Sequence, residues 1–79
     1  MIDIRDELIA RIASLAEIPA ASVKQDVPLR DQGVDSLMAM ELVAFIEKRL
    51  GIEIPEEDIP KVRTLNDILD KVRQYAGER

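Results

Sequence analysis

Ser36 is the residue of this sequence with the clearest chemical potential, in the run Asp31-Gln32-Gly33-Val34-Asp35-Ser36-Leu37. A polar loop changes there into a long segment with a helical apolar pattern, so the serine falls in the first turn of a helix. Its hydroxyl would lie beside unpaired backbone N–H groups and the positive end of the helix dipole. A phosphate attached to that oxygen would be stabilised electrostatically. The position is therefore suited to a modified serine.

Two other roles for this serine have to be weighed. Ser is a frequent N-cap residue, and Asp35 competes with it for the same capping role. Nucleophilic catalysis requires a base within hydrogen-bond distance and a third group that orients the base. The 79 residues include no histidine and no cysteine, which removes the commonest base and any thiolate chemistry. We therefore expect no catalytic residue and a protein that is not itself an enzyme.

The charge of the chain limits its partners. The net charge is −5 and the pI is about 4.6, so nucleic acid and anionic membranes would repel the protein, while basic patches on other proteins would attract it. Glu56, Glu57, Asp58 and Asp35 could hold a cation only loosely, because the acid spacing of a calcium loop is absent. We expect a solvated acidic face, no metal, no nucleic-acid partner and no membrane insertion. No segment could span a bilayer, which predicts a cytoplasmic protein.

The pattern of apolar residues predicts three main helices. Ile4, Leu8, Ile12 and Leu15 have a helical period, which predicts a first helix capped by Asp3 and ending near Ala16. A long loop to Asp35 follows, with apolar residues that could pack on the core. These residues are Ile18, Val23, Val27, Leu29 and Val34. The second helix should span residues 36–50, with Gly51 just after its end.

The last third of the chain predicts one short and one long helix. Pro55 and the acids after it favour a short helical turn over residues 55–59. Thr64 and Asp67 form a capping-box pattern at the start of the last helix, and Gly77 should end it. Its core stripe consists of Leu65, Ile68, Leu69, Val72 and Tyr75 or Ala76. We predict a single all-α domain over residues 1–79, a four-helix bundle with three main helices, one short helix and a long first loop.

The second helix carries two apolar faces. At about 100° per residue, one stripe faces the core and consists of Ala39, Leu42, Val43, Ile46 and Leu50. Leu37, Met40 and Ala44 gather on the opposite side, with Glu41, Glu47 and Lys48 among or beside them. An apolar strip with an acidic rim suits a partner that has a basic rim. The alternative is that these residues pack under the long loop.

The run around Ser36 resembles the D-x-G-x-D-S-L signature of acyl carrier proteins. The similarity continues through Glu41-Leu42, through the segment 50–57 and through Thr64-Leu65-Asn66-Asp67. It covers essentially the whole chain. The resemblance implies that Ser36 carries a phosphopantetheine arm, added from coenzyme A by a phosphopantetheinyl transferase, and that acyl groups are held as thioesters on the arm.

The resemblance also implies a docking face on the second helix. The residues of that face would be Asp35, Leu37, Met40, Glu41, Ala44 and Glu47. The implied partners are the transferase and acyl-processing enzymes such as an acyltransferase or a ketosynthase, each with a basic docking patch. We expect the carrier to be a monomer.

Two residues depart from the pattern of fatty-acid-synthesis carriers. Gln32 stands where the family often has a leucine that packs the loop on the core, and Met38 stands where such carriers usually have an acid. Lys48 and Arg49 further dilute the acidity of the helix. These departures favour a discrete carrier in polyketide or fatty acid biosynthesis, of the polyketide type. The alternatives are a peptidyl carrier of a nonribosomal or hybrid pathway, an excised domain, and an unmodified helical adaptor.

Overall fold

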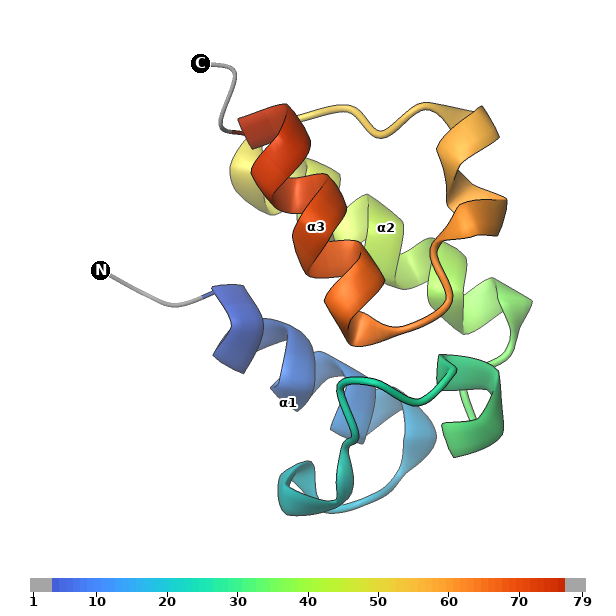
Figure 1. Ribbon diagram of the computed structural model, residues 1–79. Helices are drawn as coiled ribbons and strands as arrows, with labels where there is room; N and C mark the ends of the chain where they lie inside the picture. The colour runs from blue at the N-terminus through green and yellow to red at the C-terminus, as the bar shows by residue number, and fades with distance from the viewer. Residues whose placement is uncertain (1–3, 77–79) are drawn as a thin grey trace.

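Helices account for all the regular structure within residues 4–76, the part of the chain that the computed structural model describes (Figure 1). The α-helices are α1 (Ile4–Ala16), α2 (Ser36–Leu50) and α3 (Leu65–Ala76), and the 3-10 helices are η1 (Ala20–Ser22), η2 (Leu29–Gln32) and η3 (Glu56–Lys61). Three main helices, the short helix and the absence of strands in this part of the chain confirm the predicted fold class. The two 3-10 helices η1 and η2 inside the long loop were not predicted.

α1 buries the stripe that its sequence predicts. Leu8 and Ile12 are fully buried, and Ile4 is half-buried. The helix ends at Glu17, whose φ of 57° is left-handed, and Ile18 N–H then donates to the Ala13 carbonyl at 3.0 Å. The predicted cap Asp3 lies outside the described residues.

α2 begins and ends at the predicted residues. Gly51 follows it with a left-handed φ of 66°, and its N–H donates to the Glu47 carbonyl at 2.9 Å. This conformation suits glycine, because a Cβ would be strained there. Leu42 and Ile46 on the predicted core face are fully buried.

α3 starts with the predicted capping box. Asp67 N–H donates to Thr64 Oγ1 at 3.1 Å, and Thr64 N–H donates to Asp67 Oδ2 at 3.1 Å. Arg63 N–H donates to the same carboxylate oxygen at 3.0 Å. The apolar stripe of α3 is buried as predicted, and Tyr75 packs partly against it. Gly77, predicted to end the helix, lies outside the described residues.

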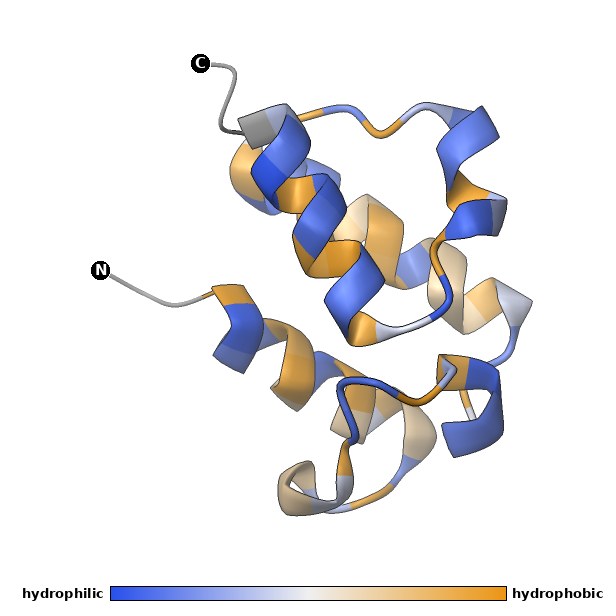
Figure 2. Cartoon of the chain, in the orientation of Figure 1, coloured by the Kyte–Doolittle hydropathy of each residue, from blue (hydrophilic) through white to orange (hydrophobic). Residues whose placement is uncertain are grey.

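All three helices and the long loop contribute to one core. In the view of Figure 1, α3 overlies α2 and α1 lies below both, and Figure 2 shows apolar segments recurring along each helix. Leu29 and Val34 of the long loop are buried in this core, and Val23, Val27 and Ile18 are half-buried. The loop is therefore held by apolar packing, as expected. No helix within residues 4–76 is long and apolar enough to cross a membrane.

Candidate functional site

The turn before α2 places Ser36 at the start of the helix. Gly33 adopts a left-handed φ of 95°, which disfavours any residue with a Cβ. Val34 is buried and donates its N–H to the Leu29 carbonyl at 3.1 Å. Asp35 then takes the N-cap position, and its Oδ1 accepts a hydrogen bond from Met38 N–H at 2.9 Å. Asp35 is thus the cap that competed with Ser36 in the sequence.

The Ser36 hydroxyl is exposed and makes no hydrogen bond to the described residues. Ser36 is the first residue of α2 and is exposed. Among the described residues, no hydrogen bond involves its Oγ, and no acceptor takes the N–H groups of Ser36 and Leu37. These two donors and the helix dipole favour negative charge at this point. The site therefore fits a serine esterified to a phosphate-bearing group.

Gln32 connects two parts of the long loop that precedes this site. Its Oε1 accepts from Lys24 N–H at 2.8 Å, and its Nε2 donates to the carbonyls of Lys24 and Val27, both at 2.9 Å. Gln32 stands where the family often has a leucine that packs the loop on the core. The structure shows polar contacts across the loop at that position instead.

Two backbone hydrogen bonds connect the same loop to the start of α3. Leu29 N–H donates to the Arg63 carbonyl at 2.8 Å, and Asn66 N–H donates to the Gln25 carbonyl at 3.0 Å. Pairs so far apart in the chain leave no local pattern, so the sequence could not predict them. Together with the Gln32 contacts, they fix the backbone that leads to Ser36.

The apolar strip of α2 (Leu37, Met40 and Ala44) is exposed. Leu37 is 74% exposed and Met40 is 60% exposed, and these are the exposed large hydrophobic residues of the described chain. The alternative, that the strip packs under the long loop, is therefore wrong. Asp35 and Glu41 beside it are also exposed. Met38 is different, because it is half-buried and packs against the core.

Glu47 has a structural contact that its sequence did not indicate. The residue is half-buried, and its Oε2 accepts a hydrogen bond from Ile54 N–H at 2.8 Å. This bond connects α2 to the segment before η3. The exposed acids of the rim are therefore Glu41 and Asp35, which also caps α2, while Glu47 is half-buried and bonded to Ile54.

A groove of about 350 Å³ lies beside the apolar strip, between α2 and η3. Met40, Val43, Ala44 and Glu47 line it from α2. The opposite wall comes from the segment 53–59, where Ile54, Pro55 and Ile59 supply the apolar surface. Its volume is at the lower end of the range of small-molecule sites, about 300–1,000 Å³.

Comparison with known proteins identifies the family of the chain. A family model described as a phosphopantetheine attachment site matches residues 6–72. An acyl carrier protein homolog from Ureaplasma parvum is 35% identical over 69 residues, which cover 87% of this chain and 88% of that protein. The chain belongs to the phosphopantetheine-attachment family of acyl carrier proteins. Phosphopantetheine, bound covalently, is accordingly the prosthetic group of this carrier.

Much longer proteins also resemble this carrier. The hybrid PKS-NRPS synthetase pvhA of Talaromyces variabilis is 39% identical over 70 residues, which are 87% of this chain. The non-reducing polyketide synthase dbaI of Emericella nidulans is 38% identical over 63 residues, which are 80% of this chain. The chain spans only 2% of the length of each.

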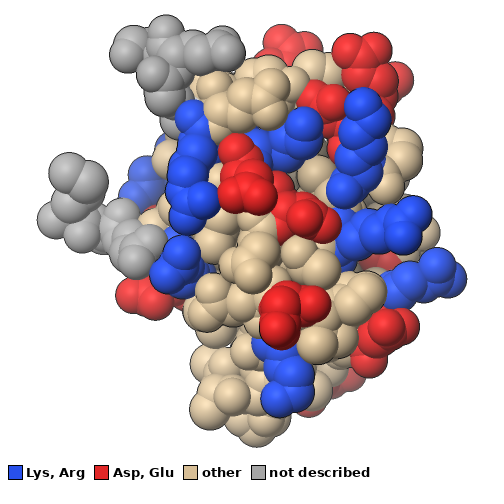
Figure 3. Space-filling model, in the orientation of Figure 1, with Lys and Arg blue, Asp and Glu red and all other residues tan. Residues whose placement is uncertain are grey.

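The acidic residues within the described part of the chain lie apart from one another as potential metal ligands. No group of three or more potential ligands comes together within residues 4–76. Glu56 and Glu57 are exposed as expected, but Asp58 is buried, so the prediction of a solvated acidic face is wrong for that residue. On the face seen in Figure 3, basic and acidic side chains are interspersed.

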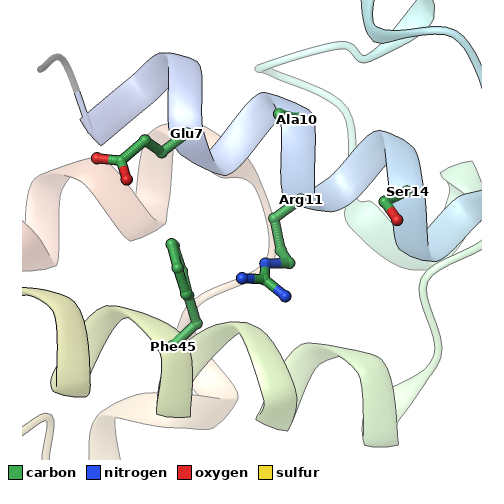
Figure 4. Close-up of a pocket in the computed structure, with 5 residues that line it drawn as sticks. All are labelled: Glu7, Ala10, Arg11, Ser14 and Phe45. Carbon is green, nitrogen blue, oxygen red and sulfur yellow. The ribbon is translucent and has the colours of Figure 1, made fainter.

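A shallow hollow on the other flank of α2 is unrelated to Ser36 (Figure 4). The Arg11 guanidinium lies 4.4 Å from the centroid of the Phe45 ring, a cation–π contact between α1 and α2. Arg49 Nε donates to Glu7 Oε1 at 3.1 Å across the same pair of helices. These contacts stabilise the packing of α1 on α2 and leave the strip of α2 free.

Proposed function

We propose that Ser36 carries the phosphopantetheine arm and that the chain presents acyl groups on this arm to partner enzymes. The exposed Ser36 hydroxyl at an open helix start is the observation that carries the proposal. Because Asp35 provides the cap, the fold does not need the hydroxyl. The free N–H groups of Ser36 and Leu37 and the helix dipole favour the negative charge of a phosphodiester.

The attachment reaction requires little from the carrier beyond this geometry. The Ser36 oxygen bonds to phosphorus, the phosphoanhydride bond of coenzyme A breaks, and adenosine bisphosphate leaves. The serine proton passes to a base of the transferase, since no described side chain of the carrier is hydrogen-bonded to the hydroxyl. Once attached, the arm supplies the thiol on which acyl groups are held as thioesters. We infer that the carrier binds, orients and presents but does not catalyse.

Mass spectrometry of the intact protein tests this assignment. The protein is incubated with coenzyme A and a promiscuous phosphopantetheinyl transferase. Wild type and the control Ser22→Ala, at another exposed serine, should gain the mass of the arm, and Ser36→Ala should not. An unchanged wild-type mass would overturn the carrier assignment, and a gain in Ser36→Ala would place the attachment at another residue.

The apolar strip and its acidic rim form the docking surface of this proposal. Leu37 and Met40 would enter an apolar depression on the partner, and Asp35 and Glu41 would face its basic rim. The strip starts next to Ser36, so a docked enzyme lies close to the attachment point. The transferase, an acyltransferase and a ketosynthase are the partners we propose.

The pathway we propose is polyketide or mixed polyketide–peptide biosynthesis. Similarity to a polyketide synthase and to a hybrid synthetase supports it. The half-buried Met38 and the basic pair Lys48-Arg49 also support it, because they leave α2 with fewer acids than a strongly acidic docking helix has. The loaded carrier should be accepted better by a polyketide ketosynthase than by one of fatty acid synthesis, and the reverse order would contradict this choice.

The groove between α2 and η3 gives the acyl group a place to bind. Each CH₂ transferred from water to an apolar wall contributes up to about 0.8 kcal/mol. Attaching an acyl chain of moderate length should therefore raise the melting temperature of the loaded carrier. A melting temperature that is independent of the chain would show that the acyl group stays in solvent.

A further inference from the structure

Asp58 is the buried charged residue of the described chain. It is 8% exposed and lies in η3. A buried carboxylate is costly unless it is paired and hydrogen-bonded. Its neighbours Glu56 and Glu57 point to solvent, so the inward direction of Asp58 is a local exception that needs a structural reason.

The partners of Asp58 come mainly from α3. The Tyr75 hydroxyl donates to Asp58 Oδ2, and Lys71 Nζ lies 3.7 Å from Oδ1. Lys61, at the end of η3, lies 4.0 Å from the same oxygen. Lys71 and Tyr75 are four residues apart, so both project from one face of α3. We refer to Asp58, Lys61, Lys71 and Tyr75 as the Asp58 cluster.

The Asp58 cluster holds a wall of the groove. Figure 1 shows η3 as a short helix with non-helical connecting segments on both sides. Ile59, next to Asp58, lines the groove together with Pro55 and Glu56. On its other side, the segment is connected to α2 by the bond from Ile54 N–H to Glu47. One polar contact to α2 and one cluster with α3 thus hold η3 and the segment before it, in addition to the apolar packing of Ile54 and Ile59 on the core.

Apart from the packing of the half-buried Ile59 on the core, η3 itself has little intrinsic stability. It is a six-residue 3-10 helix that contains Pro60, and its ends are closed by hydrogen bonds from Asp58 N–H to the Pro55 carbonyl and from Val62 N–H to the Ile59 carbonyl. Helices of this type have poor hydrogen-bond geometry and little stability of their own. Outward movement of η3 would lengthen the contact between Asp58 and Tyr75.

We propose that Asp58 and Tyr75 are positioning residues that set the width of the groove between α2 and η3, and thereby the acyl chains that the carrier shelters. The inference rests on the proposed carrier function. In the unloaded carrier, the cluster keeps η3 close to α2. A long chain displaces η3 and breaks the cluster, so part of the gain from burying the chain is offset. A variant without the cluster has no such loss on loading.

Tyr75→Phe is the test variant, since it removes the hydroxyl and keeps the ring. Hydrogen exchange of the unmodified protein comes first. The amides of Asp58 and Val62 should exchange about tenfold or more faster than in wild type, while those of Leu8 and Ile12 in α1 change less. Unchanged exchange in η3 would overturn the proposal whether or not the protein can be loaded.

The second measurement distinguishes an effect on the width of the groove from a general loss of stability. Wild type, Tyr75→Phe and the core control Ile12→Val are loaded with the bare arm or with butanoyl, octanoyl and dodecanoyl arms from the corresponding acyl-coenzyme A. The longest chain should raise the melting temperature of Tyr75→Phe by roughly 4–8 °C more than that of wild type, the shift expected from losing one such contact. Ile12→Val should show the wild-type gain, and Asp58→Asn, which keeps an acceptor for Tyr75, an intermediate one.

The outcomes are distinguishable. Equal gains in wild type, Tyr75→Phe and Ile12→Val would overturn the role of the Asp58 cluster and leave the carrier function intact. A protein whose mass does not change during loading would overturn the carrier function, and this inference with it.

Discussion

The starts of α2 and α3 each have an aspartate and a hydroxyl residue, but these residues are hydrogen-bonded differently. At α3, Thr64 and Asp67 pair reciprocally, and the Asp67 carboxylate also accepts from Arg63 N–H. At α2, Asp35 accepts a single side-chain hydrogen bond, from Met38 N–H, and Ser36 keeps a free hydroxyl. We call the start of α3 closed, because its polar groups are paired, and the start of α2 open, because the Ser36 hydroxyl is unpaired. The residue types alone do not distinguish the two.

The largest expected difference between the two helix starts is in the effects of removing their hydroxyl groups. Ser36→Ala should abolish loading and leave stability nearly unchanged, because its Oγ makes no hydrogen bond among the described residues. Thr64→Ala should still be loaded but lose about 0.5–2 kcal/mol of stability, the usual cost of losing a cap. Intact mass and urea denaturation measure the two effects. A large loss of stability in Ser36→Ala would show that the start of α2 is not open.

The two capping aspartates give the next largest difference. Asp67→Ala removes the acceptor of two backbone N–H groups and should cost about 1–3 kcal/mol. Asp35→Ala removes the acceptor of one and should cost about 0.5–2 kcal/mol. Urea denaturation of both variants, with the isosteric Asp35→Asn as a control that keeps the cap, measures the difference. A reversed order would contradict the contrast between the two starts.

Docking of partners on the surface next to the start of α2 should depend on its acidic residues. Glu41→Lys should slow delivery to a partner with a basic rim about tenfold at low salt, since a like charge then faces that rim, and should leave stability unchanged because Glu41 is exposed. Glu47→Lys should also destabilise the protein, because Ile54 N–H loses its acceptor. Delivery kinetics and thermal melting separate the two. Normal delivery by Glu41→Lys at low salt would remove the acidic rim from the docking surface.

The smallest expected effect is the pH dependence of the stability that Asp67 contributes at the start of α3. The Arg63 N–H that donates to Asp67 lowers the pKa of its carboxyl below the ordinary 3.8, and Thr64 acts in the same direction. Because the pKa is lower in the folded state, this stabilisation is fully present above the unfolded pKa and is lost as the pH falls through the folded value. Asp67→Asn should lack this part of the acid dependence, measured by urea denaturation from neutral to about pH 2. Parallel curves for both proteins would contradict it.

A similar argument applies to Asp58. The hydrogen bond from Tyr75 lowers the pKa of its carboxyl, and the charges of Lys71 and Lys61 contribute, while burial opposes them. The carboxylate therefore stays ionised at neutral pH, and its protonation requires a lower pH in the folded state than in the unfolded state. Asp58 therefore carries its negative charge at neutral pH beside Tyr75, Lys71 and Lys61.

The sequence predicted what depends on neighbours along the chain. The bounds of α2, the glycine after it and the capping box of α3 all follow from local rules on caps and left-handed residues. The two faces of α2 also followed, because helical periodicity separates Leu42 from Leu37 without knowledge of the rest of the fold. Exposure of the apolar strip needed the structure, since the long loop could have covered it.

The features that were missed depend on contacts between segments. The bond from Ile54 N–H to Glu47, the burial of Asp58 against Tyr75 and the contacts of Gln32 each join a polar side chain to a partner that a helical pattern does not specify. Glu47 and Asp58 looked like ordinary surface acids, because periodicity assigns a face but not a partner. At Gln32, three hydrogen bonds take the place of the apolar packing that a leucine would give.

The fixed backbone before Ser36 has a consequence for transfer rates. When a tethered group searches for a partner site, its effective concentration falls roughly as the −3/2 power of the tether length. The Gln32 contacts and the bonds of Leu29 and Asn66 prevent the long loop from adding to that length. With the arm on Ser36, as proposed, the tether begins at the Ser36 oxygen. The loop, although the longest non-α segment between the described α-helices, does not dilute the acyl group around a docked enzyme.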